Sequence, residues 1–90
     1  MTSERVRAIE AKLTDAFSPV ELLVKDQSHL HAGHEGAKSG GGHYDVTIVS
    51  QAFDGCRPLQ RHRMIFEALG QMMETDIHAL RIRANTPDEL

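Results

Sequence analysis

Apolar residues recur at helical spacing in residues 2–17, which predicts an amphipathic helix there. Thr2 or Ser3 can cap its start, because a side-chain oxygen accepts a hydrogen bond from a backbone N–H of the first turn. Ser18-Pro19 ends it, because the residue before a proline is pushed out of the α region. The apolar positions on this helical face are Val6, Ile9, Leu13, Ala16 and Phe17.

A second helix is predicted to begin at Pro58, because proline suits the first helical turn. Its apolar stripe starts at His62, which we interpret as a core histidine with a hydrogen-bond partner rather than as a metal ligand. The stripe ends at Met73, because the polar segment Glu74-Thr75-Asp76 is typical of a turn. Its apolar members are Ile65, Phe66, Leu69, Met72 and Met73.

Three stretches alternate between apolar and polar residues, which is typical of half-buried strands. They are Val20–Lys25, Tyr44–Ser50 and Ile77–Ala84, and the first two are predicted to pair as a hairpin. In the third stretch, the alternation predicts that His78 faces the core. The positions predicted to face the core are Val20, Leu22, Val24, Tyr44, Val46, Ile48, His78, Leu80, Ile82 and Ala84.

These elements predict one α+β domain over residues 1–90, in the order helix, two strands, helix, strand. The helices are expected to cover one face of a three-stranded sheet. After the last strand, Thr86-Pro87-Asp88-Glu89 has the cap, the proline and the acidic residues of a helical first turn. We therefore expect a helical turn after the last strand, at the end of the predicted order of elements.

Composition narrows the class of protein. The formal net charge is −3, which argues against broad nucleic-acid binding, although it leaves room for a local basic patch. Cys56 is the only cysteine, so no internal disulfide can form, as is usual in a reducing compartment. No apolar run approaches the roughly 18 residues of a membrane span, so we expect a cytoplasmic protein without a membrane partner. No catalytic dyad, triad or phosphate-binding loop supports an enzyme.

Six histidines in 90 residues are unusual, and three of them lie in the long segment Asp26–Gly42. Unstructured loops longer than about 12–15 residues are uncommon in compact domains and are usually functional or disordered. His29, His31 and His34 are therefore candidate metal ligands, because neutral imidazole is the commonest metal ligand. The alternative is a solvated polar loop, and the spacing alone does not decide between them.

His78 has two interpretations. It can form a hydrogen bond with a backbone carbonyl, or it can join one loop imidazole in a two-histidine half-site. Two ligands do not complete the coordination shell of iron or zinc, so a partner would have to supply the others.

Two patterns suggest contact with nucleic acid. Gly33-His34-Glu35-Gly36 matches a G-x-x-G clamp, but only weakly, because that clamp joins two helices and this one lies between strands. Arg61-His62-Arg63 places cations in the first turns of a helix, where they oppose the helix dipole. These residues form either a small anion or nucleic-acid patch, or a surface on which Arg63 pairs with Glu67 and Arg61 is solvated.

Several pieces of the chain, from about Val6 to Pro87, together resemble the BolA family. The most specific are the R-H-R stretch of the second helix and the H-A-L stretch of the third strand. The pieces are Phe17-Ser18-Pro19, Asp26-Gln27-Ser28, His43-Tyr44, Phe53-Asp54-Gly55, Leu59-Gln60-Arg61-His62-Arg63-Met64-Ile65 and Ile77-His78-Ala79-Leu80. The resemblance implies a KH-like α-β-β-α-β fold.

The resemblance also implies that the chain is the partner of a monothiol glutaredoxin in a heterodimer. In such pairs a [2Fe–2S] cluster bridges the two proteins, and the glutaredoxin supplies a cysteine and a bound glutathione thiol. The BolA-like side would supply His78 and a loop histidine. His31 fits the loop position best by its distance from Asp26-Gln27-Ser28, and His34 and His29 remain alternatives.

BolA-like proteins are also described as transcriptional regulators tied to the stress response and to cell morphology. On that alternative, Arg61, His62 and Arg63 would contact DNA.

Overall fold

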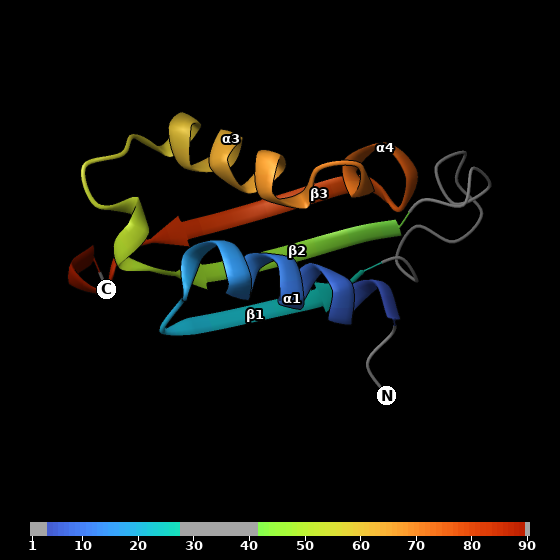
Figure 1. Cartoon of the computed structure of the whole chain (residues 1–90), viewed down its shortest axis with the longest axis horizontal. Coiled ribbons are helices and arrows are strands. Elements are labelled where there is room, and N and C mark those ends of the chain that lie inside the picture. Colours follow the sequence, from blue (N-terminus) through green and yellow to red (C-terminus); the bar gives the residue numbers. More distant parts are fainter. Residues whose placement is uncertain (1–3, 28–41, 90) are drawn as a thin grey trace.

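The computed structural model describes residues 4–27 and 42–89, and the elements follow the predicted order (Figure 1). A short helix, α4, and a 3₁₀ turn after β2 are added to that order, and the predicted terminal turn is η3. The elements are α1 Glu4–Phe17, β1 Glu21–Asp26, β2 Gly42–Val49, η2 Gln51–Phe53, α3 Pro58–Leu69, α4 Met72–Thr75, β3 Ile77–Asn85 and η3 Pro87–Glu89. The predicted α+β class is confirmed. The predicted caps Thr2 and Ser3 lie outside the described residues.

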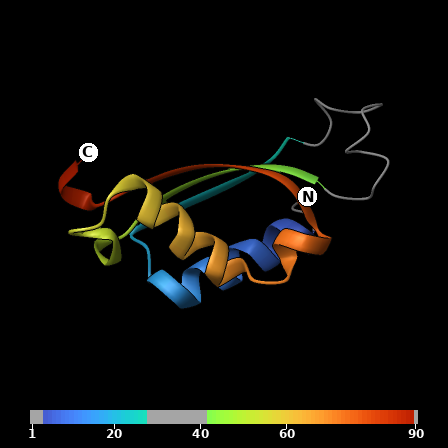
Figure 2. The ribbon, with the colours of Figure 1, turned by 90° about the horizontal axis from the view of Figure 1, so that it is seen from above.

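The three strands form one sheet in the order β1-β2-β3. β1 and β2 are antiparallel, which confirms the predicted hairpin, whereas β2 and β3 are parallel. A parallel pair needs a long crossover, and α3 with α4 provides it. The long helices lie on one face of the sheet, as predicted, and no helix of the described residues covers the opposite face, which we call the uncovered face (Figure 2).

The core lies between that covered face and the helices. Tyr44, Val46 and Ile48 of β2 are buried in the predicted alternation. The same hydrophobic cluster contains four fully buried residues of the helices: Ile9 and Leu13 of α1, and Ile65 and Leu69 of α3. The Phe53 side chain is also fully buried, and its ring centroid lies 5.0 Å from that of Phe17. Burial of one such side chain stabilises the fold by roughly 1.5–3 kcal/mol.

Two apolar residues near the α1–β1 connection were predicted to face the core but are exposed. Ala16 is exposed, because the buried stripe of α1 passes through Leu13 to Phe17. Val20 is 66% exposed, because it precedes the first residue of β1 and only its backbone N–H is held, by the Val49 carbonyl. Ser18 has a φ of 44°, a left-handed conformation that ends α1 where the proline was expected to end it.

The second predicted helix is shorter, and its predicted apolar stripe is only partly correct. Ile65, Leu69 and Met72 are buried as predicted. α3 ends at Leu69, because Gly70 adopts a φ of 56° and a separate turn of helix follows. The buried stripe contains Arg61, Ile65 and Leu69, spaced four residues apart. His62 is therefore only half-buried, and Phe66 is 40% exposed instead of buried. The prediction that both lie on the core stripe is wrong.

The described part of the chain contains no helix that is long and apolar enough to cross a membrane.

Candidate functional site

A β-bulge at the start of β3 changes the direction of His78. Gly42 lies opposite Ile77, but the next residue of β2, His43, lies opposite Ala79, so His78 is an extra residue without an opposite residue in β2. Such an insertion interrupts strand alternation. Ile77 is consequently buried and His78 is exposed. The prediction that His78 faces the core is wrong, and this bulge is the reason.

Beyond the bulge, the predicted alternation of β3 is confirmed. Leu80, Ile82 and Ala84 are partly buried and pack against the core. Ile77 and Leu80 thus both face the helices although they are three residues apart. The bulge therefore turns one residue of β3, His78, outward without moving the rest of the strand out of register with the core.

The backbone at the bulge is held from several sides. The Gly42 N–H donates to the Asp76 carbonyl at 3.0 Å, which fixes the start of β2 beside the turn before β3. A Cβ atom added at Gly42 would lie 2.5 Å from the Tyr44 hydroxyl, so only glycine fits here without a shift of that ring. Arg5 of α1 forms an ion pair with Asp76, at 3.4 Å.

The bulge brings two imidazoles together. The ring centroids of His43 and His78 are 5.1 Å apart, and the ring planes are inclined by 57°. His43 is half-buried, whereas His78 is exposed. The second residues of the neighbouring strands β2 and β3 thus present a histidine pair, which we define as His43 and His78.

His43 of the histidine pair lines a shallow depression of about 160 Å³ on the face of the sheet that points away from the helices. Its lining includes Gln27, His43, Asp45 and Arg81. The Gln27 side-chain amide donates to a carboxylate oxygen of Asp45 at 3.5 Å. Burial raises the pKa of the neighbouring Tyr44 phenol, so this hydroxyl stays neutral and is not an anionic ligand.

The described residues provide at most part of a metal site. Within residues 4–27 and 42–89, no group of three or more histidine, cysteine, aspartate or glutamate side chains could hold a metal ion. The three candidate loop ligands His29, His31 and His34, and the G-x-x-G match, lie outside the described residues. The histidine pair is the only pair of histidine rings in contact in the part of the chain that the structure describes.

The histidine pair passes a simple test of fit. Two imidazoles on one tetrahedral metal, with metal–nitrogen distances of roughly 2 Å, have ring centroids about 5 Å apart. The observed separation of 5.1 Å agrees with that value. Two histidines on one iron are also a known ligand set of [2Fe–2S] clusters. The spacing, which is also that of ordinary ring packing, thus allows both imidazoles to bind one metal whose other ligands would come from elsewhere.

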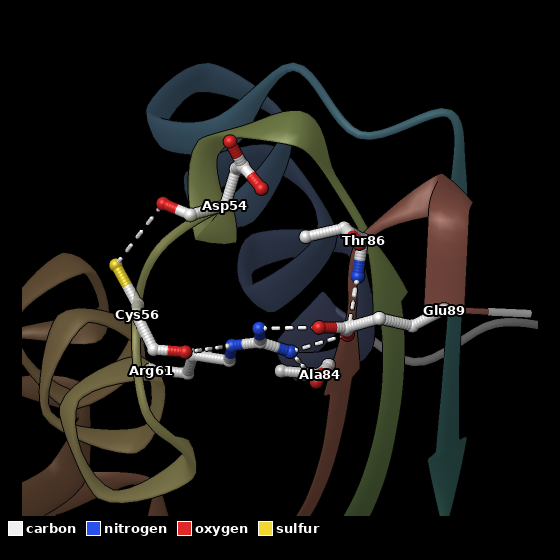
Figure 3. A network of polar contacts seen from close by, with 6 residues as sticks. All are labelled: Asp54, Cys56, Arg61, Ala84, Thr86 and Glu89. Atoms are coloured by element: carbon white, nitrogen blue, oxygen red, sulfur yellow. Dashed lines mark hydrogen bonds and ion pairs between the residues drawn. The ribbon is translucent and has the colours of Figure 1, made fainter.

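Arg61, a predicted nucleic-acid contact, instead belongs to a buried network at the opposite end of β3 (Figure 3). Its residue exposure is 7%. Its guanidinium donates to the carbonyls of Cys56 and Ala84 at 2.9 and 3.0 Å, and to both carboxylate oxygens of Glu89 at 2.6 and 2.7 Å. The prediction that Arg61 faces a nucleic acid or solvent is therefore wrong.

Glu89 completes this network in two ways. Its carboxylate also accepts a hydrogen bond from the Thr86 backbone N–H at 2.9 Å, as the glutamate at position N3 of a capping box does. The side-chain hydrogen bond from Arg61, with that backbone bond, lowers the pKa of Glu89 to about 2. The predicted terminal turn thus forms, and it is held to α3 and β3.

The other members of the predicted basic patch behave differently. Arg63 is exposed and His62 is half-buried on α3. The predicted alternative, an Arg63–Glu67 ion pair, is absent from the ion pairs among the described residues. Cys56 is half-buried, and its thiol lies 3.8 Å from the Asp54 carbonyl oxygen.

Comparison with known proteins agrees with this architecture. The family model described as "BolA-like protein" matches residues 13–89. The chain belongs to the BolA family. Among BolA relatives, BolA-like protein 1 of Mus musculus is 44% identical over 80 residues, which are 89% of this chain and 56% of that protein. The chain thus spans little more than half of that relative.

Other BolA relatives carry more specific names. The DNA-binding transcriptional regulator BolA of Escherichia coli is 43% identical over 81 residues, 90% of this chain and 74% of that protein. The solved BolA domain of SufE1 from Arabidopsis thaliana superposes with a TM-score of 0.89 at 40% identity, and the match covers 100% of both chains. The resemblance found in the sequence, and the fold that it implied, are therefore confirmed.

Two contacts of this BolA domain were not predicted from its sequence. The sequence places His43-Tyr44 at the start of a strand, but does not connect His43 with His78, because a parallel register with a bulge is not visible in the chain. Arg61 was predicted at the surface, because arginine is rarely buried without a partner and its partner lies at the far end of the chain. The T-x-x-E pattern of Thr86 and Glu89 indicates the capping hydrogen bond of the last turn, but not the contact of Glu89 with Arg61.

Proposed function

We propose that this chain is an adaptor without catalytic activity that binds a monothiol glutaredoxin and shares a [2Fe–2S] cluster with it. The observation that supports this role is the histidine pair, in which two imidazoles lie 5.1 Å apart beside an exposed edge. In this proposal the glutaredoxin supplies a cysteine and a glutathione thiol. The BolA side supplies His78 and one further histidine.

Two properties of the site support the proposal. His78 is exposed, so a ligand from another protein can approach the same metal. The Arg5–Asp76 pair and the Gly42–Asp76 hydrogen bond hold the backbone around His78 and so limit the motion of its ring.

The second BolA ligand has two candidate sources. His31 or His34, with His29 as a further alternative, would supply it from residues 28–41, as the family resemblance implies. His43 would supply it from β2, where its ring already lies beside His78. Either choice places imidazoles on one iron. Compared with thiolates, such ligands raise the potential of a cluster and make its binding sensitive to protonation.

The test is co-assembly of the cluster with a monothiol glutaredoxin and glutathione, followed by visible absorption and circular dichroism. We expect His78→Ala to change both spectra, and one of His43→Ala, His31→Ala, His34→Ala and His29→Ala to do the same. His62→Ala is the matched control, because His62 lies on α3 away from the histidine pair. A His78→Ala complex with the spectra of the unmodified complex would refute the proposal.

A second candidate function is DNA binding in transcriptional regulation of the stress response and cell morphology. It is favoured by the name of the 43% identical Escherichia coli relative. Since Arg61 is buried, the contact surface would consist of His62 and Arg63 on α3. Gel-shift assays should then show binding that weakens as salt rises from about 50 mM, and Arg63→Ala should reduce the slope of that dependence. Absence of binding at low salt would eliminate this function.

A further inference from the structure

We propose that the uncovered face of the sheet is a docking surface for an acidic, extended segment of a partner protein. α1 and α3 lie on the other face, so side chains that point away from them meet no element of the described chain (Figure 2). Docking on this face does not require a cluster, so this proposal goes beyond the function proposed above.

The strand register aligns the side chains of this face in rows. One row contains Leu23, Thr47 and Arg83, and the next contains Lys25, Asp45 and Arg81. These six side chains line a shallow depression of about 290 Å³, the larger of the two described on the molecule. We call these six residues the open-face patch.

The charge of the open-face patch is opposite to that of the whole chain. Lys25, Arg81 and Arg83 are all exposed, and none of them belongs to an ion pair among the described residues. Asp45 is the single carboxylate of the patch, and the side chain of Gln27 donates a hydrogen bond to it. The patch is therefore positive on a chain whose formal net charge is −3. A surface of this kind attracts a negatively charged partner and sets its orientation.

The spacing of the cations suits an extended chain. Arg81 and Arg83 are alternate residues of one strand, so they lie on one side about 6.6–6.8 Å apart. Carboxylates at alternate positions of an extended peptide have the same spacing. Leu23, which is 50% exposed, adds an apolar contact in the row of Arg83. The segment that fits would therefore carry acidic residues at alternate positions together with an apolar side chain.

The composition of the face favours an acidic protein segment over a nucleic acid. Single-stranded nucleic acids bind to sheets largely by stacking bases on aromatic rings. The open-face patch has no aromatic side chain, because Tyr44 of β2 faces the core and is buried. Three cations around a central carboxylate also give few phosphate contacts for a polyanion.

The open-face patch is continuous with the histidine pair. Asp45 and Arg81 line both the larger depression and the smaller one that His43 borders. A partner held by the patch would therefore extend toward His43 and His78. This consequence, unlike the docking itself, rests on the proposed cluster-sharing function.

The experiment is an amide chemical-shift titration of the full, metal-free chain with a synthetic peptide of alternating glutamate and valine. We expect shifts in β1, β2 and β3 around the open-face patch, and weaker binding as salt is added. Reversing either cation, with Arg81→Glu or Arg83→Glu, should weaken binding about tenfold. Arg7→Glu is the matched control, because it makes the same charge change on an exposed position of α1 and should leave binding unchanged.

Three results would overturn the proposal. They are no shifts at millimolar peptide, shifts confined to α1 or α3, and equal weakening by Arg7→Glu and Arg81→Glu. A single-stranded thymidine oligonucleotide that binds the same strands more tightly than the peptide would assign the face to nucleic acid instead. Because no metal is present, none of these results bears on the cluster. Unchanged cluster spectra of His78→Ala would in turn leave the docking proposal standing.

Discussion

The two ends of β3 differ in how the chain uses its polar side chains. At the C-terminal end, the Arg61 guanidinium is surrounded by acceptors from the turn before α3, from β3 and from η3, all within the same chain (Figure 3). At the N-terminal end, a bulge turns the His78 imidazole outward beside His43. The first end stabilises the fold. The second leaves a ligand exposed to other molecules, which is typical of a functional site.

The distinction matters because both ends contain residues of the motifs that identify the family. Arg61 belongs to the R-H-R stretch and His78 to the H-A-L stretch. A motif residue can therefore serve folding or binding, and only its partners in space show which. Four experiments test which residues serve folding and which serve binding, and they follow in order of expected effect.

The largest expected effect is that of Arg61→Ala on stability. It would leave the carbonyls of Cys56 and Ala84 without their side-chain donor and release η3. We expect the free energy of unfolding to fall by about 2 kcal/mol or more, since unsatisfied buried acceptors cost roughly 1–3 kcal/mol. Denaturant unfolding measures it. Arg63→Ala, two residues along on the exposed face of α3, should change stability by less than about 0.5 kcal/mol. Equal losses for both variants would contradict the assigned role of Arg61.

Gly42→Ala tests how closely the backbone at the N-terminal end of β2, beside the bulge, packs against the Tyr44 ring. The new Cβ would lie 2.5 Å from the Tyr44 hydroxyl and 2.6 Å from a ring carbon, so the buried ring must shift. Overpacking of this kind costs typically 1–3 kcal/mol, and we expect about 1 kcal/mol, measured by denaturant unfolding. In a Tyr44→Phe background, which removes the nearest atom, the cost of Gly42→Ala should be smaller. The same cost in both backgrounds would show that the contact is relieved elsewhere.

Glu89→Gln tests the electrostatic part of the Arg61 network. The pKa of Glu89 is lowered from 4.5 to about 2 in the folded chain. A lowered pKa means that its stabilisation is present above pH 4.5 and is lost as the pH falls towards 2. We expect the unmodified chain to be more stable than Glu89→Gln at pH 6, with a difference that shrinks on acidification. Unfolding curves across this range measure it, and a constant difference would contradict the assignment.

The smallest expected effect on stability is that of His78→Ala. Because its side chain is exposed at a bulge, the free energy of unfolding should change by less than about 0.5 kcal/mol. The same variant should change the spectra of the shared cluster, as proposed above. Ile77→Ala is the contrasting variant. Ile77 precedes His78 in the chain, but its side chain is buried, so its truncation should lower the free energy of unfolding by about 2–4 kcal/mol. A His78→Ala chain as unstable as Ile77→Ala would place His78 with the folding residues.

The accuracy of the sequence predictions followed the regularity of each element. β2 alternates regularly from Gly42 to Ile48, and its buried residues Tyr44, Val46 and Ile48 were predicted correctly. The stripe of α1 was correct except at Ala16. In α3, the apolar Phe66 is exposed and the charged Arg61 is buried, because Glu89 from the end of the chain satisfies that arginine. A local pattern holds no information about such a distant partner.

The order of helices and strands, the hairpin and the helix-covered face follow from periodicity in the chain, because helices and strands bury one side at fixed local spacings. The family also follows from the sequence, since its motifs lie within short segments. Which motif residues serve folding and which serve binding was decided only by the tertiary structure. The parallel register of β2 and β3 places the inserted residue His78 beside His43. The packing of the last turn against α3 brings the Glu89 carboxylate to the Arg61 guanidinium. Both contacts join segments far apart in the sequence, and their formation depends on the packing of the whole domain.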